Sequence, residues 1–136
     1  MRILVVDGQG GGIGRSVVER LKAELPEAEL LAVGTNSAAT ANMMKAGATA
    51  GATGENALLY NCPRADVIVG PIGIILANAM MGEISPAMAC AVSGSEAKKV
   101  LIPSARCHVH VAGAQELSLS RYLEEAVAAV KSCCGK

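Results

Sequence analysis

The chain has 136 residues, the length of one ordinary domain, and 51% of them are hydrophobic while 18% are charged. This composition is enough to fill a core and excludes a disordered chain. The 12 basic residues balance the 12 acidic ones, Phe and Trp are absent and there are two Tyr, so neither phosphate neutralisation nor base stacking supports a nucleic-acid partner. We expect one domain over residues 1–136 that binds no nucleic acid.

No segment has the character of an export signal or a membrane anchor. The apolar start is short and runs directly into Asp7 and glycines. The most apolar later stretch, residues 67–81, contains Gly70, Pro71 and Gly73 and is shorter than the ~20 residues of a membrane span. Five cysteines without an export signal indicate a reducing compartment. We therefore expect a cytoplasmic protein with no membrane partner.

The N-terminal segment predicts a strand, a glycine-rich loop and a helix in succession. Residues 3–6 form an apolar β-type run, residues 8–14 contain five glycines, and a helix is expected from about Gly12 to Leu25. In such an arrangement, backbone N–H groups and the positive end of the helix dipole converge on one small volume. Glycines also let a ligand approach the main chain closely. The loop predicts a site for a phosphate or another anion, and it predicts no particular reaction.

Three known loop types can be compared with this one. The dinucleotide fingerprint Gly-x-Gly-x-x-Gly fails, because Ile13 stands three residues after Gly10. The Walker A loop fails, because Arg15 stands where that loop needs lysine. The loop resembles the Thr-Gly-x-x-x-Gly-Ile-Gly loop of short-chain dehydrogenases, with Asp7 in place of Thr. The alternative is that these glycines only permit tight packing of the helix on the strand.

Further along, short β-type runs alternate with helical patterns. Strands are expected at residues 30–33, 48–52, 66–69, 100–102 and 108–111. Helices are expected at residues 37–46 with Asn36 or Ser37 as the cap, 55–61, 70–81, 86–93 and 117–132. Strands separated by helices indicate a mostly parallel sheet covered on both faces. The expected fold class is α/β, Rossmann-like and doubly wound, with three layers and residues 3–6 as a central strand.

Ligands of open α/β sheets bind beyond the carboxyl ends of the strands. Small, glycine-rich and hydrogen-bonding residues follow each of the first five expected strands, which favours a small-molecule site there. The candidate binding residues are Asp7, Gly8, Gln9, Gly10, Gly11, Gly12, Ile13, Gly14, Thr35, Asn36, Gly54, Glu55, Asn56, Gly70, Pro71, Ser104 and Arg106.

The end of the second expected strand bears on the kind of ligand. An NAD site usually has an acid there, about 20 residues after the loop, to accept the ribose hydroxyls. This chain has Gly34-Thr35-Asn36-Ser37 instead. The pattern disfavours NAD and leaves NADP, another nucleotide or a smaller phosphate open, so the cofactor stays unidentified. Arg15 and Arg106 are the nearest candidate anion partners. The alternatives are a solvated helix residue for Arg15, which has at least equal weight, and an ordinary loop residue for Arg106.

Catalytic constellations are sparse. Neither tyrosine is followed four residues later by lysine, so dehydrogenase activity is not expected. On a strand, His108 and His110 would share one face while Cys107 points the other way, and two histidines make an incomplete zinc site. We therefore predict no metal and read both histidines as satisfied or surface residues. Glu55 and Glu83 are the acids expected nearest the site, and the catalytic residues stay unknown.

Several longer stretches of the sequence carry a family resemblance when taken together: residues 5–14, 51–57, 70–74, 82–89 and 97–103. Together they resemble a small bacterial family, common in anaerobes, that is known as a domain of unknown function. The resemblance spans nearly the whole chain. It implies that these segments form one domain, and it implies no activity and no binding residues.

Two classes of function remain open from the sequence. One is a protein that binds a nucleotide, dinucleotide or small phosphometabolite at residues 8–14, whether or not it is an enzyme. The other is a non-catalytic structural or assembly subunit whose loop serves packing, and a metal-dependent enzyme built on the histidines is a weaker third. Asp7 could hold a metal–phosphate complex, accept ribose hydroxyls or bond to loop N–H groups. The nearly uncharged stretch 72–81 is either buried or a subunit contact, so we expect a homo-oligomer.

Overall fold

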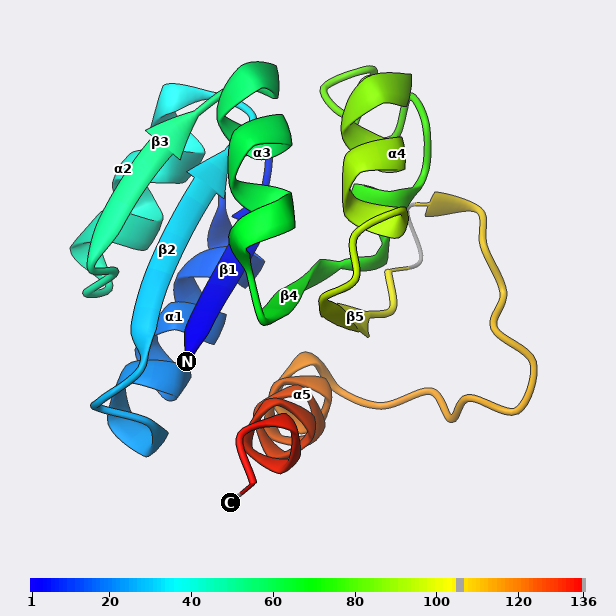
Figure 1. Cartoon of the computed structure of the whole chain (residues 1–136). Helices are drawn as coiled ribbons and strands as arrows, with labels where there is room; N and C mark the ends of the chain where they lie inside the picture. The colour runs from blue at the N-terminus through cyan, green and yellow to red at the C-terminus, as the bar shows by residue number, and fades with distance from the viewer. Residues whose placement is uncertain (105–106, 136) are drawn as a thin grey trace.

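The computed structural model describes residues 1–104 and 107–135, which contain a five-stranded parallel sheet with the order β3-β2-β1-β4-β5. Its strands are β1 (Arg2–Asp7), β2 (Glu29–Gly34), β3 (Ala50–Thr53), β4 (Val67–Pro71) and β5 (Lys98–Ile102). The chain runs from β1 outward to β3 and then returns to the other side of β1 (Figure 1). The strand order therefore reverses between β1 and β4, which is where doubly wound sheets bind ligands.

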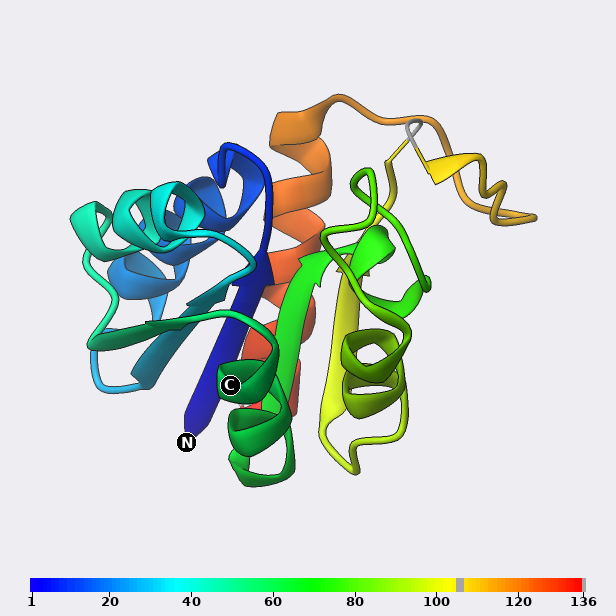
Figure 2. The ribbon, with the colours of Figure 1, turned by 90° about the horizontal axis from the view of Figure 1, so that it is seen from above.

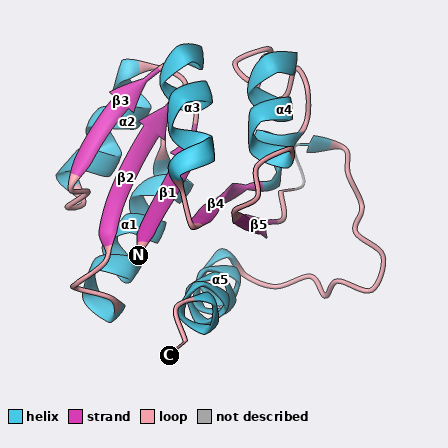
Figure 3. Ribbon diagram, in the orientation of Figure 1, coloured by secondary structure: helices cyan, strands magenta, loops and turns pink. Residues whose placement is uncertain are grey.

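Helices cover both faces of this sheet. One face carries α1 (Gly12–Glu24), α2 (Ser37–Lys45) and α5 (Leu119–Cys133), and the other carries α3 (Glu55–Asn61) and α4 (Pro86–Ser93) (Figure 2). Strands and helices alternate along the chain up to β5 (Figure 3). The expected α/β class, with a doubly wound sheet, three layers and residues 3–6 at the centre, is confirmed.

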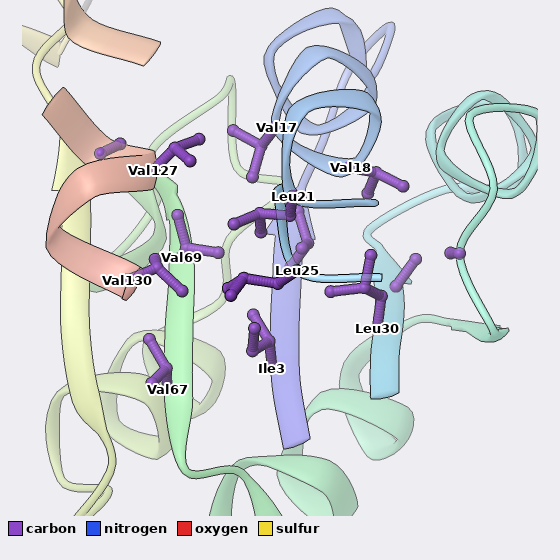
Figure 4. Packing of buried hydrophobic residues seen from close by; sticks show 14 of the residues in the cluster. Ile3, Val17, Val18, Leu21, Leu25, Leu30, Val67, Val69, Val127 and Val130 are labelled. Atoms are coloured by element: carbon purple, nitrogen blue, oxygen red, sulfur yellow. The ribbon is translucent and has the colours of Figure 1, made fainter. Parts of the chain in front are cut away.

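The central strand is apolar without interruption because both of its faces are buried. Ile3 and Val5 pack with the inner faces of α1 and α5, and Figure 4 shows the place of Ile3. Leu4 and Val6 pack with α3, α4 and the segment between β4 and α4 on the opposite face. All four side chains have no exposed surface, as expected for a parallel sheet with helices on both sides. This burial holds the end of β1, and with it the glycine loop, in a rigid frame.

Side-chain caps begin three of the helices. Asn36 Oδ1 accepts a hydrogen bond of 2.9 Å from the Ala39 N–H at the start of α2, as expected. Ser85 caps α4 with Pro86 at its first position, again as expected, and Ser118 caps α5. Helix α1 differs, because its N-cap residue is Gly11, which has no side chain to accept a hydrogen bond. Its first N–H groups are therefore left for another partner.

The helix expected over residues 70–81 is wrong. A short 3₁₀ helix, η2 (Ile72–Ile75), is followed by a loop in which Asn78 and Met81 have φ values of 66° and 57°. The Asn78 N–H donates to the Ile84 carbonyl at 2.7 Å and closes this loop. Closure buries Ile84 completely against α4. Tertiary packing thus overrides the helical preference of an alanine- and methionine-rich stretch.

The strand expected over residues 108–111 is also wrong. These residues belong to an irregular segment that leaves the end of β5 and returns to α5, drawn in yellow and orange in Figure 1. Because α5 covers the opposite face of the sheet from α4, the chain must cross the sheet edge here instead of adding a strand to it. In the described part of the chain, no helix is long and apolar enough to cross a membrane.

Candidate functional site

A cavity of about 930 Å³ opens at the carboxyl ends of β1 and β4, where the strand order reverses. The glycine loop forms one wall, and the loop after η2 forms another. Ser104, Cys107 and His108 from the segment after β5, together with Leu119 at the start of α5, complete the lining. The volume lies within the range of about 300–1,000 Å³ that is usual for small-molecule sites.

Asp7 ends β1 directly beneath the glycine loop. Its side chain is 5% exposed, its Oδ1 accepts the Gly8 N–H at 2.7 Å, and its Oδ2 accepts the Gly14 N–H at 2.7 Å. Burial raises the pKa of this carboxyl, the two backbone hydrogen bonds oppose the rise, and the charge of Glu83 adds to it. Asp7 therefore bonds to loop N–H groups, which is one of the three roles considered for it.

Three N–H groups of the loop have no hydrogen-bond partner within residues 1–104 and 107–135. They belong to Gly10, Gly12 and Ile13, which all line the cavity. Gly11 stands among them with a φ of 72°, and its own N–H donates to the Gly8 carbonyl at 2.9 Å. This left-handed conformation favours glycine. The unpaired groups lie at the positive end of a 13-residue helix, which is the usual chemistry of an anion site.

Glu83, which is not among the residues that line the cavity, holds the first half of the loop. Its Oε1 accepts hydrogen bonds from the Gln9 N–H at 2.8 Å, from the Asn36 Nδ2 at 3.0 Å and from the Thr35 hydroxyl. The Thr35 hydroxyl contributes most, followed by the Gln9 N–H, to a pKa that is lowered from its ordinary value. Asn36 also donates to the Gln9 carbonyl at 2.9 Å. Gln9 is thereby held at a φ of 49°, which non-glycine residues rarely adopt.

The glycines of the loop divide into two groups by the space around them. A Cβ on Gly8 would lie 2.6 Å from the Met80 sulfur, and a Cβ on Gly14 would lie 2.6 Å from the Met43 sulfur. A Cβ on either Gly10 or Gly12 would have no atom within 4 Å. Tight packing therefore explains why positions 8 and 14 are glycine. It does not explain Gly10 and Gly12, which have open space around them.

The structure brings about half of the predicted site residues together at the cavity. Those that line the cavity are Asp7, Gly8, Gln9, Gly10, Gly11, Gly12, Ile13, Pro71 and Ser104. Thr35 and Asn36 are bonded to Glu83 outside the cavity, and Gly14 is bonded to Asp7. Arg106 lies outside the described residues.

The other candidate residues do not line the cavity and make contacts elsewhere in the structure. Gly54, Glu55 and Asn56 follow the outermost strand β3, and the Glu55 carboxylate accepts a hydrogen bond from the Ser85 hydroxyl. Gly70 packs against the carbonyl of Val6, which leaves no room for a side chain. Arg15 forms an exposed ion pair with Glu19 at 3.3 Å instead of facing the cavity.

Sequence reasoning missed much of the apolar wall. The lining residues that it did not place there are Leu76, Ala77, Asn78, Ala79, Met80, Met81, Cys107, His108 and Leu119. The apolar pattern of residues 76–81 indicated a helix and gave no sign of the loop. His108 faces the cavity, whereas His110 borders a separate hollow. Across residues 1–104 and 107–135, no three His, Cys, Asp or Glu side chains are grouped to hold a metal ion.

Comparison with known proteins places the chain in a family. The solved structures that it resembles include a dodecameric FMN-dependent Ubix-like decarboxylase from Escherichia coli O157:H7, with 20% identity and a TM-score of 0.48 over 98% of this chain and 76% of that one. They also include AibC, with 17% identity and a TM-score of 0.48 over 96% of this chain and 38% of that one. No curated protein matches the chain. Residues 2–135 match the domain of unknown function DUF3842, and the chain belongs to this family.

Proposed function

We propose that this protein binds a phosphate-bearing small molecule, a nucleotide or a phosphometabolite, with the phosphate on the glycine loop. The supporting observation is the set of unpaired N–H groups on Gly10, Gly12 and Ile13, which line a cavity at the start of a helix whose N-cap residue is Gly11. Phosphate oxygens would satisfy these donors and gain from the helix dipole. The charge of Asp7 beneath the loop is balanced by the hydrogen bonds that its carboxylate accepts from two backbone N–H groups.

The remainder of the cavity suits the uncharged body of such a ligand. Leu76, Met80, Met81 and Leu119 provide an apolar wall, and methionine side chains adapt to flat or irregular shapes. NADP or another nucleotide falls within this ligand class. Asp7, Cys107 and His108 are the titratable side chains among the lining residues, and we assign no reaction to them. We keep the expectation of a homo-oligomer as part of the proposal, because Met81 is 97% exposed at the rim of the cavity.

A second candidate function is a non-catalytic assembly subunit whose glycine loop serves packing. The observation that favours it is the close approach of Met80, Met43 and Ala39 to Gly8, Gly14 and Gly11. Those three glycines would be needed whether or not a ligand binds. The two open glycines, Gly10 and Gly12, are not explained by packing, and this difference favours the binding function.

The experiment is a thermal-shift screen with NADP, NAD, ATP, GTP, FMN and inorganic phosphate. One class of ligand should raise the melting temperature, since binding adds about 2.7 kcal/mol at a hundredfold excess over Kd. Gly12→Val should fold, because its Cβ meets no atom within 4 Å, and it should abolish the shift by filling the space above the loop. Ala38→Val is the matched control, as Ala38 is an exposed residue in the first turn of α2.

The screen has two outcomes that would reject binding at this loop. One is the absence of a shift with every ligand at millimolar concentration. The other is a shift that is the same in wild type and in Gly12→Val. Either result would leave the loop with a packing role.

A further inference from the structure

The loop that follows η2 bridges the point where the strand order reverses. Glu83 lies in this loop, on the β4 side of β1, yet its carboxylate is bonded to Thr35 and Asn36, which follow β2 on the other side. The same oxygen accepts the Gln9 N–H above the end of β1. The Glu83 side chain therefore connects the loop after η2 to the segments that follow β1 and β2.

This bridge occupies the β2 side of the ligand crevice. In doubly wound sheets a dinucleotide lies across the reversal point, with one nucleoside half over the end of the second strand and its ribose held there by an acid. Here the Thr35 hydroxyl and the Asn36 amide are both engaged by Glu83. Neither of them lines the cavity, which instead extends from the glycine loop towards Pro71, Ser104 and Leu119. The open part of the crevice thus lies over β4 and beyond β5.

We propose that Glu83 is a specificity-determining residue that closes the β2 half of the site and restricts the ligand to a mononucleotide or another phosphomonoester. The inference rests on the proposed function and narrows its ligand class, because it excludes dinucleotides such as NADP. Closure acts through the position of the side chain, which is fixed by three hydrogen bonds. It also acts through charge, because a second phosphate placed on that side of the loop would meet a carboxylate.

The test compares matched ligand pairs that share one half. FMN and FAD have the same ring system, and nicotinamide mononucleotide and NAD have the same nicotinamide half. Dissociation constants are measured by calorimetry for wild type, Glu83→Ala, Glu83→Gln and the control Glu29→Ala, which removes the same charge at the opposite end of β2. Wild type and the control should bind at least one monophosphate about tenfold or more tightly than its dinucleotide partner.

The two substitutions of Glu83 separate position from charge. Glu83→Ala should relax the discrimination by about tenfold or more, since both the side chain and its charge are removed. Glu83→Gln keeps an acceptor oxygen for the three donors and a near-native fold, and it should relax the discrimination by less. If Glu83→Ala does not fold, as judged by circular dichroism, Glu83→Gln and the wild-type ligand pairs decide the question.

Three outcomes would overturn the inference, and one of them also removes the proposed function. Equal binding of mononucleotides and dinucleotides by wild type rejects closure and leaves phosphate binding intact. Discrimination that is unchanged in both folded Glu83 variants, or in Glu83→Gln when Glu83→Ala does not fold, rejects Glu83 as its determinant. If neither a phosphomonoester nor inorganic phosphate binds to wild type, the proposed function fails and the inference fails with it.

Discussion

The Oδ2 atom of Asp7 accepts a hydrogen bond of 2.7 Å from the backbone N–H of Gly14. This bond joins the last residue of β1 to the first turn of α1, while Oδ1 holds the Gly8 N–H at the start of the loop. Both ends of the glycine loop are therefore tied to one buried carboxylate. The N–H groups between them are held in a fixed backbone. The loop therefore loses less conformational entropy when a ligand binds.

Replacing Asp7 by Asn should destabilise the fold by about 1–2 kcal/mol. Asn has one acceptor oxygen, so its amide group would face a second N–H group inside the protein. The loss of stability is smaller than the loss of two charge-assisted bonds would give. The neutral Asn side chain avoids the cost of burying a charge, which is also the cost that raises the pKa of Asp7. Urea unfolding measures the change.

The matched control for this substitution is Asp66→Asn. Asp66 also accepts a backbone N–H, from Arg2 at 2.8 Å, but it is exposed. Water can replace that bond, so the expected loss is below about 1 kcal/mol. Equal losses in the two variants would show that the Asp7 bonds do not depend on burial.

The fold can be predicted from the sequence where local chemistry and burial agree. Ile3, Val5 and Val67 lie in strands that are buried on both faces, and this environment requires a continuous apolar run. Asn36 and Ser85 are recognisable as helix caps because their side chains compete for backbone N–H groups. The conformation of residues 76–84 cannot be predicted in this way. It depends on the bond between Asn78 and Ile84 and on the packing of Ile84, which are contacts formed only by the assembled chain.

About half of the candidate site can be predicted from the sequence. The glycine spacing locates the loop, and Asp7 is expected beside it because it ends the strand. Glu83 is expected near the site, but its bond to the loop has no signal in the sequence, since it lies 74 residues from Gln9 and its carboxylate reaches the loop only through the fold. The sequence likewise does not show that Gly14 is tightly packed while Gly10 and Gly12 have open space. That difference depends on the neighbours that helix α2 supplies.

Stability should depend on Glu83 in a defined pH range. Hydrogen bonds from Thr35, Gln9 and Asn36 lower the pKa of Glu83 from its ordinary value of 4.5. A carboxyl whose pKa is lower in the folded state stabilises the fold above its unfolded pKa, and this contribution is lost as the pH falls through the folded value. The difference in unfolding free energy between wild type and Glu83→Gln should be full above about pH 5 and shrink below it.

Asp7 gives the opposite sign and serves as the comparison for Glu83. Its pKa is raised above 3.8 by burial, so protonation of Asp7 adds stability that is present below the unfolded value and lost as the pH rises through the folded value. Wild type should therefore gain stability relative to Asp7→Asn as the pH is lowered through this range. Urea titrations at several pH values measure how the difference in unfolding free energy from wild type changes with pH for each variant. A change of the same sign in Glu83→Gln and Asp7→Asn would contradict the opposite pKa shifts of the two residues.

Gly70 is expected to be indispensable for the contact between the central strands. A Cβ at this position would lie 2.2 Å from the Val6 carbonyl oxygen, which is backbone within the buried strand β1. Neither strand can move without disturbing the packing of Val6 and Val69, both of which have no exposed surface. Gly70→Ala should therefore destabilise the fold by about 1–3 kcal/mol or prevent folding, as is typical of overpacked cores.

The control for Gly70→Ala is a glycine at the same end of β1 with free space around it. Gly10→Ala adds a methyl group that meets no atom within 4 Å. Because alanine restricts the unfolded chain more than glycine does, this variant should be neutral or more stable by up to about 1 kcal/mol. Denaturant unfolding of both variants measures the difference. A Gly70→Ala protein as stable as Gly10→Ala would mean that β1 and β4 can separate at the reversal point, and the rigid frame inferred for the site would then be incorrect.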